Sequence, residues 1–147
     1  MSAAEDIGAG LPSCSCRGGE KITAVALVGP FDAYSASKAA KIASGWAKAS
    51  GLPGLHNGQA DAMRHCAWNC IMTVRIGASQ AKDVADNHEA CSANPLCEHE
   101  MDLNNNAAGR ALGGASGTKE ADCKQLCRTE AQKTSGGKLQ VALNTPP

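Results

Sequence analysis

The chain has 147 residues, the size of one typical domain, and its 14 basic residues balance its 14 acidic residues. No run of Lys or Arg stands out, which argues against binding to nucleic acid. No apolar stretch approaches the roughly 18 residues of a membrane-spanning segment. Aromatic residues make up only 3% of the chain, so we expect a core built mainly from small side chains such as Ala.

The N-terminal half is predicted to contain an irregular arm, one short strand and two helices. Residues 1–20 are rich in Gly, Pro and Ser and form the arm. The apolar run Ile22–Val28 is typical of a short β-strand. An Ala- and Lys-rich segment predicts a helix over Ser35–Ser50, and apolar residues at helical spacing predict a stronger helix over Ala60–Ile76.

The C-terminal half is predicted to be mostly helical. Helices are expected over Ser79–Glu89, about Pro95–Leu112 and about Lys119–Lys133, because turn-forming residues bound each segment. The tail segment Lys138–Asn144 favours a short strand. The sequence therefore predicts a single domain over residues 1–147. Its fold class is mostly α: a compact, disulfide-stapled bundle of about five helices with a minor β element.

Eight cysteines in a chain of this length indicate a disulfide framework. Cys66 and Cys70 are four residues apart, so both lie on one face of their predicted helix. Cys123 and Cys127 have the same spacing on the last predicted helix. Two such faces packed antiparallel can be joined twice, as Cys66–Cys127 and Cys70–Cys123. Each bond would stabilise a core of small residues by about 2–4 kcal/mol.

The pairing of the other four cysteines stays open. Cys91 and Cys97 flank a proline-containing turn and could close a small loop. Cys14 and Cys16 would then bond each other, or alternatively pair with the 91/97 set. No Cys-x-x-Cys knuckle is present, so a cytosolic metal protein is not expected.

The N-terminus lacks the basic region and apolar stretch of a secretory leader. Disulfides nevertheless persist mainly in oxidising compartments. We therefore expect a secreted protein, either one whose leader has been removed or one exported by a specialised secretion machine.

Ionisable and amide residues gather between positions 56 and 110. Asp61, Arg64 and His65 are three and four residues apart and line one face of their predicted helix. An ordinary surface pair between Asp61 and Arg64, worth about 0.3–0.5 kcal/mol, would also explain two of them. A single histidine on a helix is also more often structural than catalytic.

A second polar face is predicted on the helix over Pro95–Leu112, where Asp102, Asn105, Asn106 and Gly109 lie at three- and four-residue spacing. Such a face makes a poor core but a good wall for a polar ligand, because amides and carboxylates can bind sugar hydroxyls or orient a water. A frayed helix end is the alternative explanation. Asn inside a helix costs stability, however, which something else should offset.

Three segments in order, His56–Trp68, Asp86–Glu89 and Met101–Arg110, carry the patterns Asp-Ala-x-Arg-His-x-x-Trp, His-Glu and Met-Asp-x-x-Asn-Asn-x-x-Gly-Arg. They resemble an uncharacterised bacterial helical domain of secreted effectors and polymorphic toxins. The resemblance spans about residues 56–110. Asn104 stands where that family often has His or Tyr, and the cysteines are not part of its pattern. The resemblance implies an antibacterial secreted effector and leaves the chemistry open.

We expect a hydrolase that cuts the glycan strand of peptidoglycan, as a muramidase or glucosaminidase does. Glu89, at a helix end, would be the general acid, and Asp102 or Asp61 would be the base or stabiliser. A helix-terminal Glu among small helices also resembles the layout of lysozyme-like enzymes. No metal or cofactor is expected. The residues expected to bind the substrate are His56, Arg64, His65, His88, Asn105, Asn106 and Arg110.

Three other functions stay open. In a metal-dependent phospholipase or nuclease, histidines would hold Zn²⁺ together with nearby carboxylates, although no His-Glu-x-x-His motif is present. The candidate histidines are His56, His65, His88 and His99. In a peptidase, a Cys paired with His65 or His88 would attack an amide, although the even cysteine count argues against a free thiol. A non-enzymatic, disulfide-rich binding module would need none of these side chains.

The expected place of action is the periplasm of target bacteria, where disulfides are stable and peptidoglycan is accessible. Phospholipid is accessible there too, and the zero net charge weakens the nuclease alternative, so a phospholipase is the second choice among enzymes. Delivery by contact-dependent secretion, as in type VI secretion, would require two partners. These are the secretion apparatus and a cognate immunity protein that blocks the cleft.

Overall fold

The computed structural model describes residues 19–92, 94, 96–133 and 136–141. These residues form six helices, which confirms the predicted mostly α bundle, and they contain no strand, so the expected minor β element is wrong for this part of the chain. The helices are α2 (Glu20–Val28), α3 (Pro30–Ala49), α4 (Gln59–Ile76), α5 (Ala78–Ala90), α6 (Leu96–Gly114) and α7 (Glu120–Gln132).

Helix α2 occupies the segment that was predicted to be a strand. Of its residues only Ala24 is buried, whereas Ile22 and Leu27 are exposed. The described residues offer no second strand for pairing, and the segment instead forms a helix that packs against α3 and α5. Gly29 separates α2 from α3, and Pro30 opens α3 well before the predicted start of that helix.

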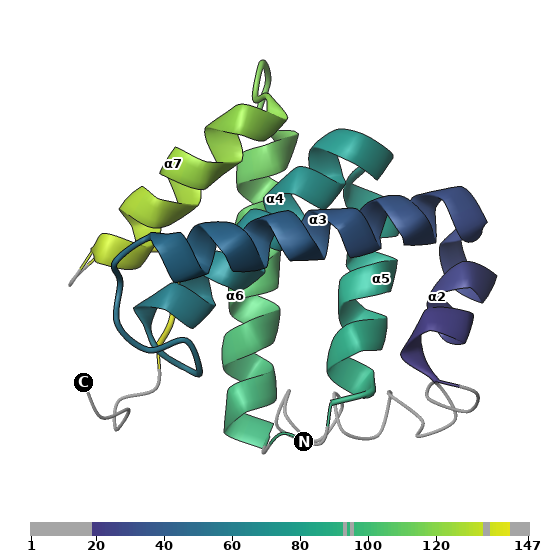
Figure 1. Cartoon of the computed structure of the whole chain (residues 1–147), viewed down its shortest axis with the longest axis horizontal. Coiled ribbons are helices and arrows are strands. Elements are labelled where there is room, and N and C mark those ends of the chain that lie inside the picture. The colour runs from purple at the N-terminus through teal and green to yellow at the C-terminus, as the bar shows by residue number, and fades with distance from the viewer. Residues whose placement is uncertain (1–18, 93, 95, 134–135, 142–147) are drawn as a thin grey trace.

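Helix α4 is the most buried helix and packs against α3, α5, α6 and α7. In Figure 1, α3 crosses in front of α4, and α5 and α6 run side by side below α3. Helix α3 contacts the core through a stripe of alanines, so the core is built from small side chains, as the composition predicted. The buried alanines of α3 are Ala36, Ala39, Ala43 and Ala47.

Helices α4 and α6 approach each other so closely that their backbones touch at two glycines. A Cβ atom at Gly109 would lie 2.2 Å from the carbonyl oxygen of Cys66, and one at Gly113 would lie 2.5 Å from that of Cys70. Any larger residue would force the two helices apart, because the atoms in the way belong to the backbone. This close approach brings the polar face of α6 against the polar face of α4.

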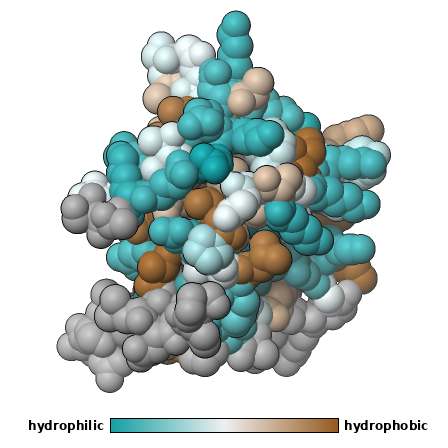
Figure 2. All heavy atoms as spheres, turned by 60° about the vertical axis from the view of Figure 1, so that its left-hand side comes forward, coloured by the Kyte–Doolittle hydropathy of each residue, from teal (hydrophilic) through white to brown (hydrophobic). Residues whose placement is uncertain are grey.

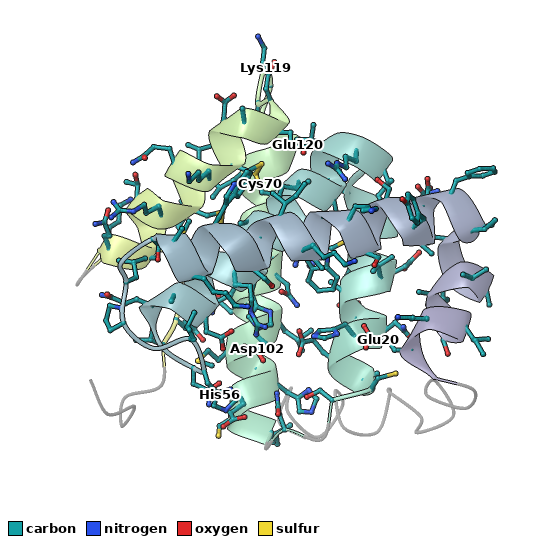
Figure 3. The ribbon with its side chains drawn as sticks, viewed as in Figure 1. Glu20, His56, Cys70, Asp102, Lys119 and Glu120 are labelled. Carbon is teal, nitrogen blue, oxygen red and sulfur yellow. A yellow bond between two sulfur atoms is a disulfide. The ribbon has the colours of Figure 1, made fainter. Side chains whose placement is uncertain are left out.

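Two disulfides join α4 to α7, and they are the predicted pairs Cys66–Cys127 and Cys70–Cys123. The Cα atoms are 5.7 Å apart in each pair, a normal separation for a disulfide. Figure 3 labels Cys70, whose side chain points toward α7. The four-residue spacing in the sequence therefore identified both bonds correctly.

The predicted bond between Cys91 and Cys97 is wrong, because Cys97 is a free and exposed thiol. Cys91 is disulfide-bonded. The alternative in which both Cys91 and Cys97 pair with the arm is excluded for the same reason. Cys14 and Cys16 lie outside the described residues, as does most of the arm predicted over residues 1–20.

The C-terminal segment shows no strand over its described residues 136–141. No described helix combines the length and the apolar character needed to cross a membrane, in agreement with the sequence. The face of the molecule seen in Figure 2 is largely hydrophilic, with hydrophobic residues scattered over it. That face lies on the left-hand side of Figure 1, where α7 lies, opposite the side that carries α2.

Candidate functional site

Six buried polar side chains lie together between α4, α5 and α6, around the imidazole of His65. None of the six residues is more than 5% exposed. Burying a polar group costs free energy unless the group is hydrogen-bonded or paired. The partners of each side chain in this cluster therefore have to be identified. The members of this His65 cluster are Asp61, His65 and Asn69 on α4, Glu89 near the end of α5, and Asp102 and Asn106 on α6.

One nitrogen of His65 is held by an amide network. His65 Nδ1 lies 3.1 Å from Asn106 Oδ1, which also accepts a hydrogen bond from Asn69 Nδ2 at 2.9 Å. The amide nitrogen of Asn106 donates to Glu89 Oε1 at 3.0 Å. Because the Asn106 oxygen is the acceptor, Nδ1 carries a proton and donates it. The network therefore leaves the lone pair of the neutral ring on Nε2.

The other nitrogen of His65 faces two carboxylates. Nε2 lies 3.3 Å from Asp102 Oδ1 and 3.6 Å from Asp61 Oδ1. Asp61 is further held by the backbone N–H of Asn57, at 2.8 Å, and by Arg64 Nη2, at 2.5 Å. Asp102 Oδ1 differs, since it accepts no hydrogen bond from any residue that the structure describes.

Burial and the neighbouring carboxylates act in opposite directions on the pKa of His65 but in the same direction on the pKa of Asp102. Desolvation lowers the pKa of His65, although the charges of Asp61 and Glu89 partly counteract this effect. Desolvation, together with the charges of Glu89 and Asp61, raises the pKa of Asp102 to about 7. Near neutral pH, the Asp102 carboxyl can therefore either release or accept a proton, as an acid or base in catalysis must do.

A cavity of about 510 Å³ opens in front of His65, between α2, α3, α4 and α5. Its volume is in the range of small-molecule sites. Most of its wall is apolar, and its polar side chains include Arg64, His65 and His88. The small or apolar lining residues are Ala24, Val25, Pro30, Ala33, Ala36, Ala40, Trp68 and Val84.

His88 lies on the α5 side of the same cavity. Its Nδ1 is 2.7 Å from Glu20 Oε1 on α2, and its ring meets the ring of Trp68 edge to face at 5.2 Å. The hydrogen bond to Glu20 raises the pKa of His88. Figure 3 shows Glu20 on α2 directed toward α5, so the pair ties these two helices together at the cavity.

The structure brings the three predicted catalytic carboxylates, Asp61, Glu89 and Asp102, together around His65. None of the three lines the cavity, and Glu89 is only 1% exposed, behind His65 and Asn106. The residue at the boundary between cluster and cavity is His65, which the sequence predicted as a substrate-binding residue.

The other predicted substrate-binding residues have different positions. Arg64 and His88 line the cavity, whereas His56 is exposed and outside the cluster. Asn105 holds the C-terminal segment, because its side chain accepts from the N–H of Gln140 at 2.7 Å and donates to its carbonyl oxygen at 2.9 Å. Arg110 contacts the cluster at Asn69, by donating to its Oδ1 at 2.9 Å, and does not line the cavity.

Several residues of the site were not predicted from the sequence, among them Asn69, Trp68, Glu20 and Lys21. Asn69 lies four residues after His65, so the same spacing that linked Asp61 to His65 could have identified it. Trp68 belongs to the recognised motif, but its place in the cavity depends on α3, where its Nε1 donates to the carbonyl oxygen of Ala36 at 3.0 Å. No sequence spacing indicates such a contact between distant segments.

Comparison with protein families gives a match over most of the chain. The model of a family described as a domain of unknown function, DUF6973, matches residues 23–137, which include all six described helices except the first three residues of α2. The chain therefore belongs to this family. No solved structure matches the chain.

Proposed function

We propose that this member of the DUF6973 family is a hydrolase that cleaves an ester bond of a phospholipid. Its substrate would lie in the cavity between α2, α3, α4 and α5, and the attacking water would be activated at His65. The observation that carries the proposal is that His65 joins a buried set of carboxylates to a mainly apolar cavity.

The chemistry rests on the groups around His65 Nε2. Asn106 fixes the ring through Nδ1, so Nε2 is the atom that can take a proton from water. Asp102 and Asp61 lie close to this nitrogen and would stabilise the imidazolium that forms. The pKa of Asp102, raised to about 7, gives the cluster a second group that can exchange a proton near neutral pH.

The walls of the cavity favour a lipid over a sugar. Sugar sites are rich in hydrogen-bonding groups, whereas half of the lining residues here are Ala, Val, Pro or Trp and most of the wall is apolar. Arg64 and Lys21 supply positive charge at the cavity, which would suit a phosphate group. Ile22, Leu27 and Phe31 are exposed on the neighbouring surface of α2 and α3, at 65%, 51% and 88%, and could contact the surface of a bilayer.

Peptidoglycan cleavage is the second candidate. The observation in its favour is that Asp102 can carry a proton near pH 7, as the general acid of a glycosidase must. Against it stands the burial of Glu89, the predicted general acid, away from the cavity. With either substrate, the disulfides fit our proposal of an antibacterial effector that acts in the periplasm and is neutralised by an immunity protein.

The test is a parallel digestion of phospholipid vesicles and purified peptidoglycan sacculi by the oxidised protein, with the products identified by mass spectrometry. We expect free fatty acid and lysophospholipid, and a loss of about 100-fold or more in rate for His65→Gln. The matched control is Asp83→Asn, a charge change at an exposed position of α5.

Intact lipid would overturn the proposal. Release of sugar-containing fragments from sacculi would then establish the second candidate. If both substrates stayed intact, a non-enzymatic binding module would be the better explanation.

A further inference from the structure

We infer that His65 Nε2, Asp61 Oδ1 and Asp102 Oδ1 form a binding site for one divalent transition-metal ion. These three residues can each offer one ligand atom such that all three atoms lie within 4.8 Å of one another. Ligand atoms bound to one metal ion at about 2.0–2.2 Å lie within this range of one another. The role of such an ion in catalysis rests on the proposed function, but its binding does not.

The orientation of His65 supports this site. Nδ1 donates to Asn106 Oδ1, which leaves Nε2 as the acceptor on the side of the two aspartates. Three acceptor atoms therefore converge when the ring is neutral. The donor beside them is Arg64 Nη2, which lies 2.5 Å from Asp61 Oδ1 and 3.5 Å from His65 Nε2. A metal-bound histidine typically donates its other N–H to an oxygen acceptor, which is the arrangement that Asn106 provides here.

The environment of the buried Asp102 carboxylate is an independent observation in favour of the metal site. Its side chain is only 4% exposed, and its Oδ1 accepts no hydrogen bond from the described residues, although it points at His65 Nε2 from 3.3 Å. A buried carboxylate oxygen without a donor carries the full cost of its desolvation. A cation between Asp102 and His65 would satisfy this oxygen.

The charges around the site also favour a cation. Three carboxylates, those of Asp61, Glu89 and Asp102, lie within 3.6 Å of His65. The cationic side chain that pairs with them is Arg64, through Asp61, and it is 42% exposed. An ion at the site would replace the hydrogen bond from Arg64 to Asp61 Oδ1, and the half-exposed Arg64 side chain would then turn outward into solvent.

The ligand types indicate which ions fit. One imidazole nitrogen and two carboxylate oxygens suit Zn²⁺, Mn²⁺ or Co²⁺, whereas Ca²⁺ prefers a larger set of oxygen ligands. His65 also lines the cavity, so the side of the ion facing the cavity would be open to water or substrate. In the proposed hydrolase, such an ion would replace the lone pair of Nε2 as the group that activates the attacking water, because a bound metal ion lowers the pKa of its water.

The test is isothermal titration calorimetry of the oxidised full chain with ZnCl₂, followed by the visible absorption spectrum with Co²⁺. The titration uses a Cys97→Ser background, because the free thiol of Cys97 is itself a potential zinc ligand. We expect one ion per chain and an affinity loss of about 100-fold or more for Asp102→Asn, since even outer-shell changes cost 10–100-fold. Asp83→Asn, at an exposed position, is expected to leave the affinity unchanged.

Circular dichroism and thermal melting check that the variants fold, and His65→Gln serves as a second ligand variant. Absence of binding by Zn²⁺, Mn²⁺ and Co²⁺, or equal binding by Asp102→Asn and the unchanged chain, would overturn the inference. A protein that binds the ion but leaves phospholipid intact would refute the proposed function alone. A protein that binds the ion but hydrolyses lipid at full rate after removal of all metal would refute the catalytic role of the ion alone.

Discussion

His65 Nδ1 on α4 lies 3.1 Å from Asn106 Oδ1 on α6, and this contact determines which nitrogen of the imidazole is available to the site. The same amide donates to Glu89 Oε1 and accepts from Asn69 Nδ2, so its orientation is fixed from both ends. A neutral amide in this position separates an imidazole from a carboxylate and satisfies both.

Replacing Asn106 by Asp keeps the shape but removes the donor to Glu89. Two buried carboxylates would then face each other, and we expect a loss of about 3–5 kcal/mol in the free energy of unfolding at pH 8. The loss is expected to be smaller at pH 5, because burial raises the pKa of the new carboxyl and its protonation restores a donor. Urea unfolding at both pH values measures the effect.

The control for this change is Asn104→Asp on the same helix, where the amide donates to the carbonyl oxygen of Lys138 at a more exposed position. Its cost should be about 1–2 kcal/mol, because the substitution removes two partly solvated hydrogen bonds, to the carbonyl oxygen of Lys138 and to Asn105 Oδ1. An equal loss of stability in the Asn106→Asp protein at pH 5 and pH 8, relative to the unchanged chain, would contradict the expected pairing of carboxylates.

The close contact between α4 and α6 predicts that any substitution of Gly109 strongly lowers the stability of the fold. In Gly109→Ala the new Cβ would lie 2.2 Å from the carbonyl oxygen of Cys66, so the helices must separate. We expect a loss of about 3 kcal/mol or more in urea unfolding. Gly45→Ala, in α3 with no atom within 4 Å of the new Cβ, should instead raise stability by about 1 kcal/mol through helix propensity. Similar effects at both positions would rule out the close approach.

The pair between His88 and Glu20 predicts a pH-dependent stability. Their hydrogen bond raises the pKa of His88 above 6.5 and lowers that of Glu20 below 4.5. The contribution of His88 is fully present below pH 6.5 and is lost as the pH rises through its raised pKa, while that of Glu20 is lost as the pH falls through its lowered pKa. The pair should therefore stabilise most between these limits, by less than about 1 kcal/mol because both side chains are partly solvated.

Thermal melting of the unchanged chain and of Glu20→Gln at pH 5.5 and pH 8.5 checks this expectation. The difference between the two proteins should be larger at pH 5.5. If the difference in melting temperature were instead larger at pH 8.5, the ion pair between His88 and Glu20 would not be the cause of the pH dependence of stability.

The two disulfides are nested, and their effects should not add. Cys66–Cys127 spans 61 residues and Cys70–Cys123 spans 53, but once either bond is present the other closes only a ring of about ten residues. Replacing one pair by Ala should therefore cost about 3 kcal/mol, and replacing both about 7 kcal/mol. Urea unfolding of the two double variants and the quadruple variant tests this, and costs that add within error would argue against a loop-entropy origin.

Much of the fold could be predicted from the sequence, because helical spacing and cysteine spacing are local signals. The long helix over Ala60–Ile76 and the pairing of Cys66 and Cys70 with α7 follow from such spacing. The prediction of a strand over Ile22–Val28 was wrong, because an apolar run of this length fits a strand or a helix equally well. Packing against α3 and α5, which no local pattern reveals, decides its structure.

The candidate site was predictable in part for the same reason. Asp61 and His65 share a helical face, and the polar face of α6 that carries Asp102 was recognised as unusual for a core. The central position of His65 depends on the approach of α6 at Gly109, and the cavity depends on how α2 and α3 cover α4. These are contacts between distant segments, and only the structure contains them.

Along α4, each of two cluster residues stands directly before a half-cystine: His65 before Cys66, and Asn69 before Cys70. A thiol reductant in a purification buffer, or production in a reducing cytoplasm, would therefore loosen the same turns of helix that hold the imidazole in register with Asn106. If a preparation handled under such conditions is inactive, the cause can be reduction of the disulfides, and the result says nothing about the function of the folded, oxidised protein.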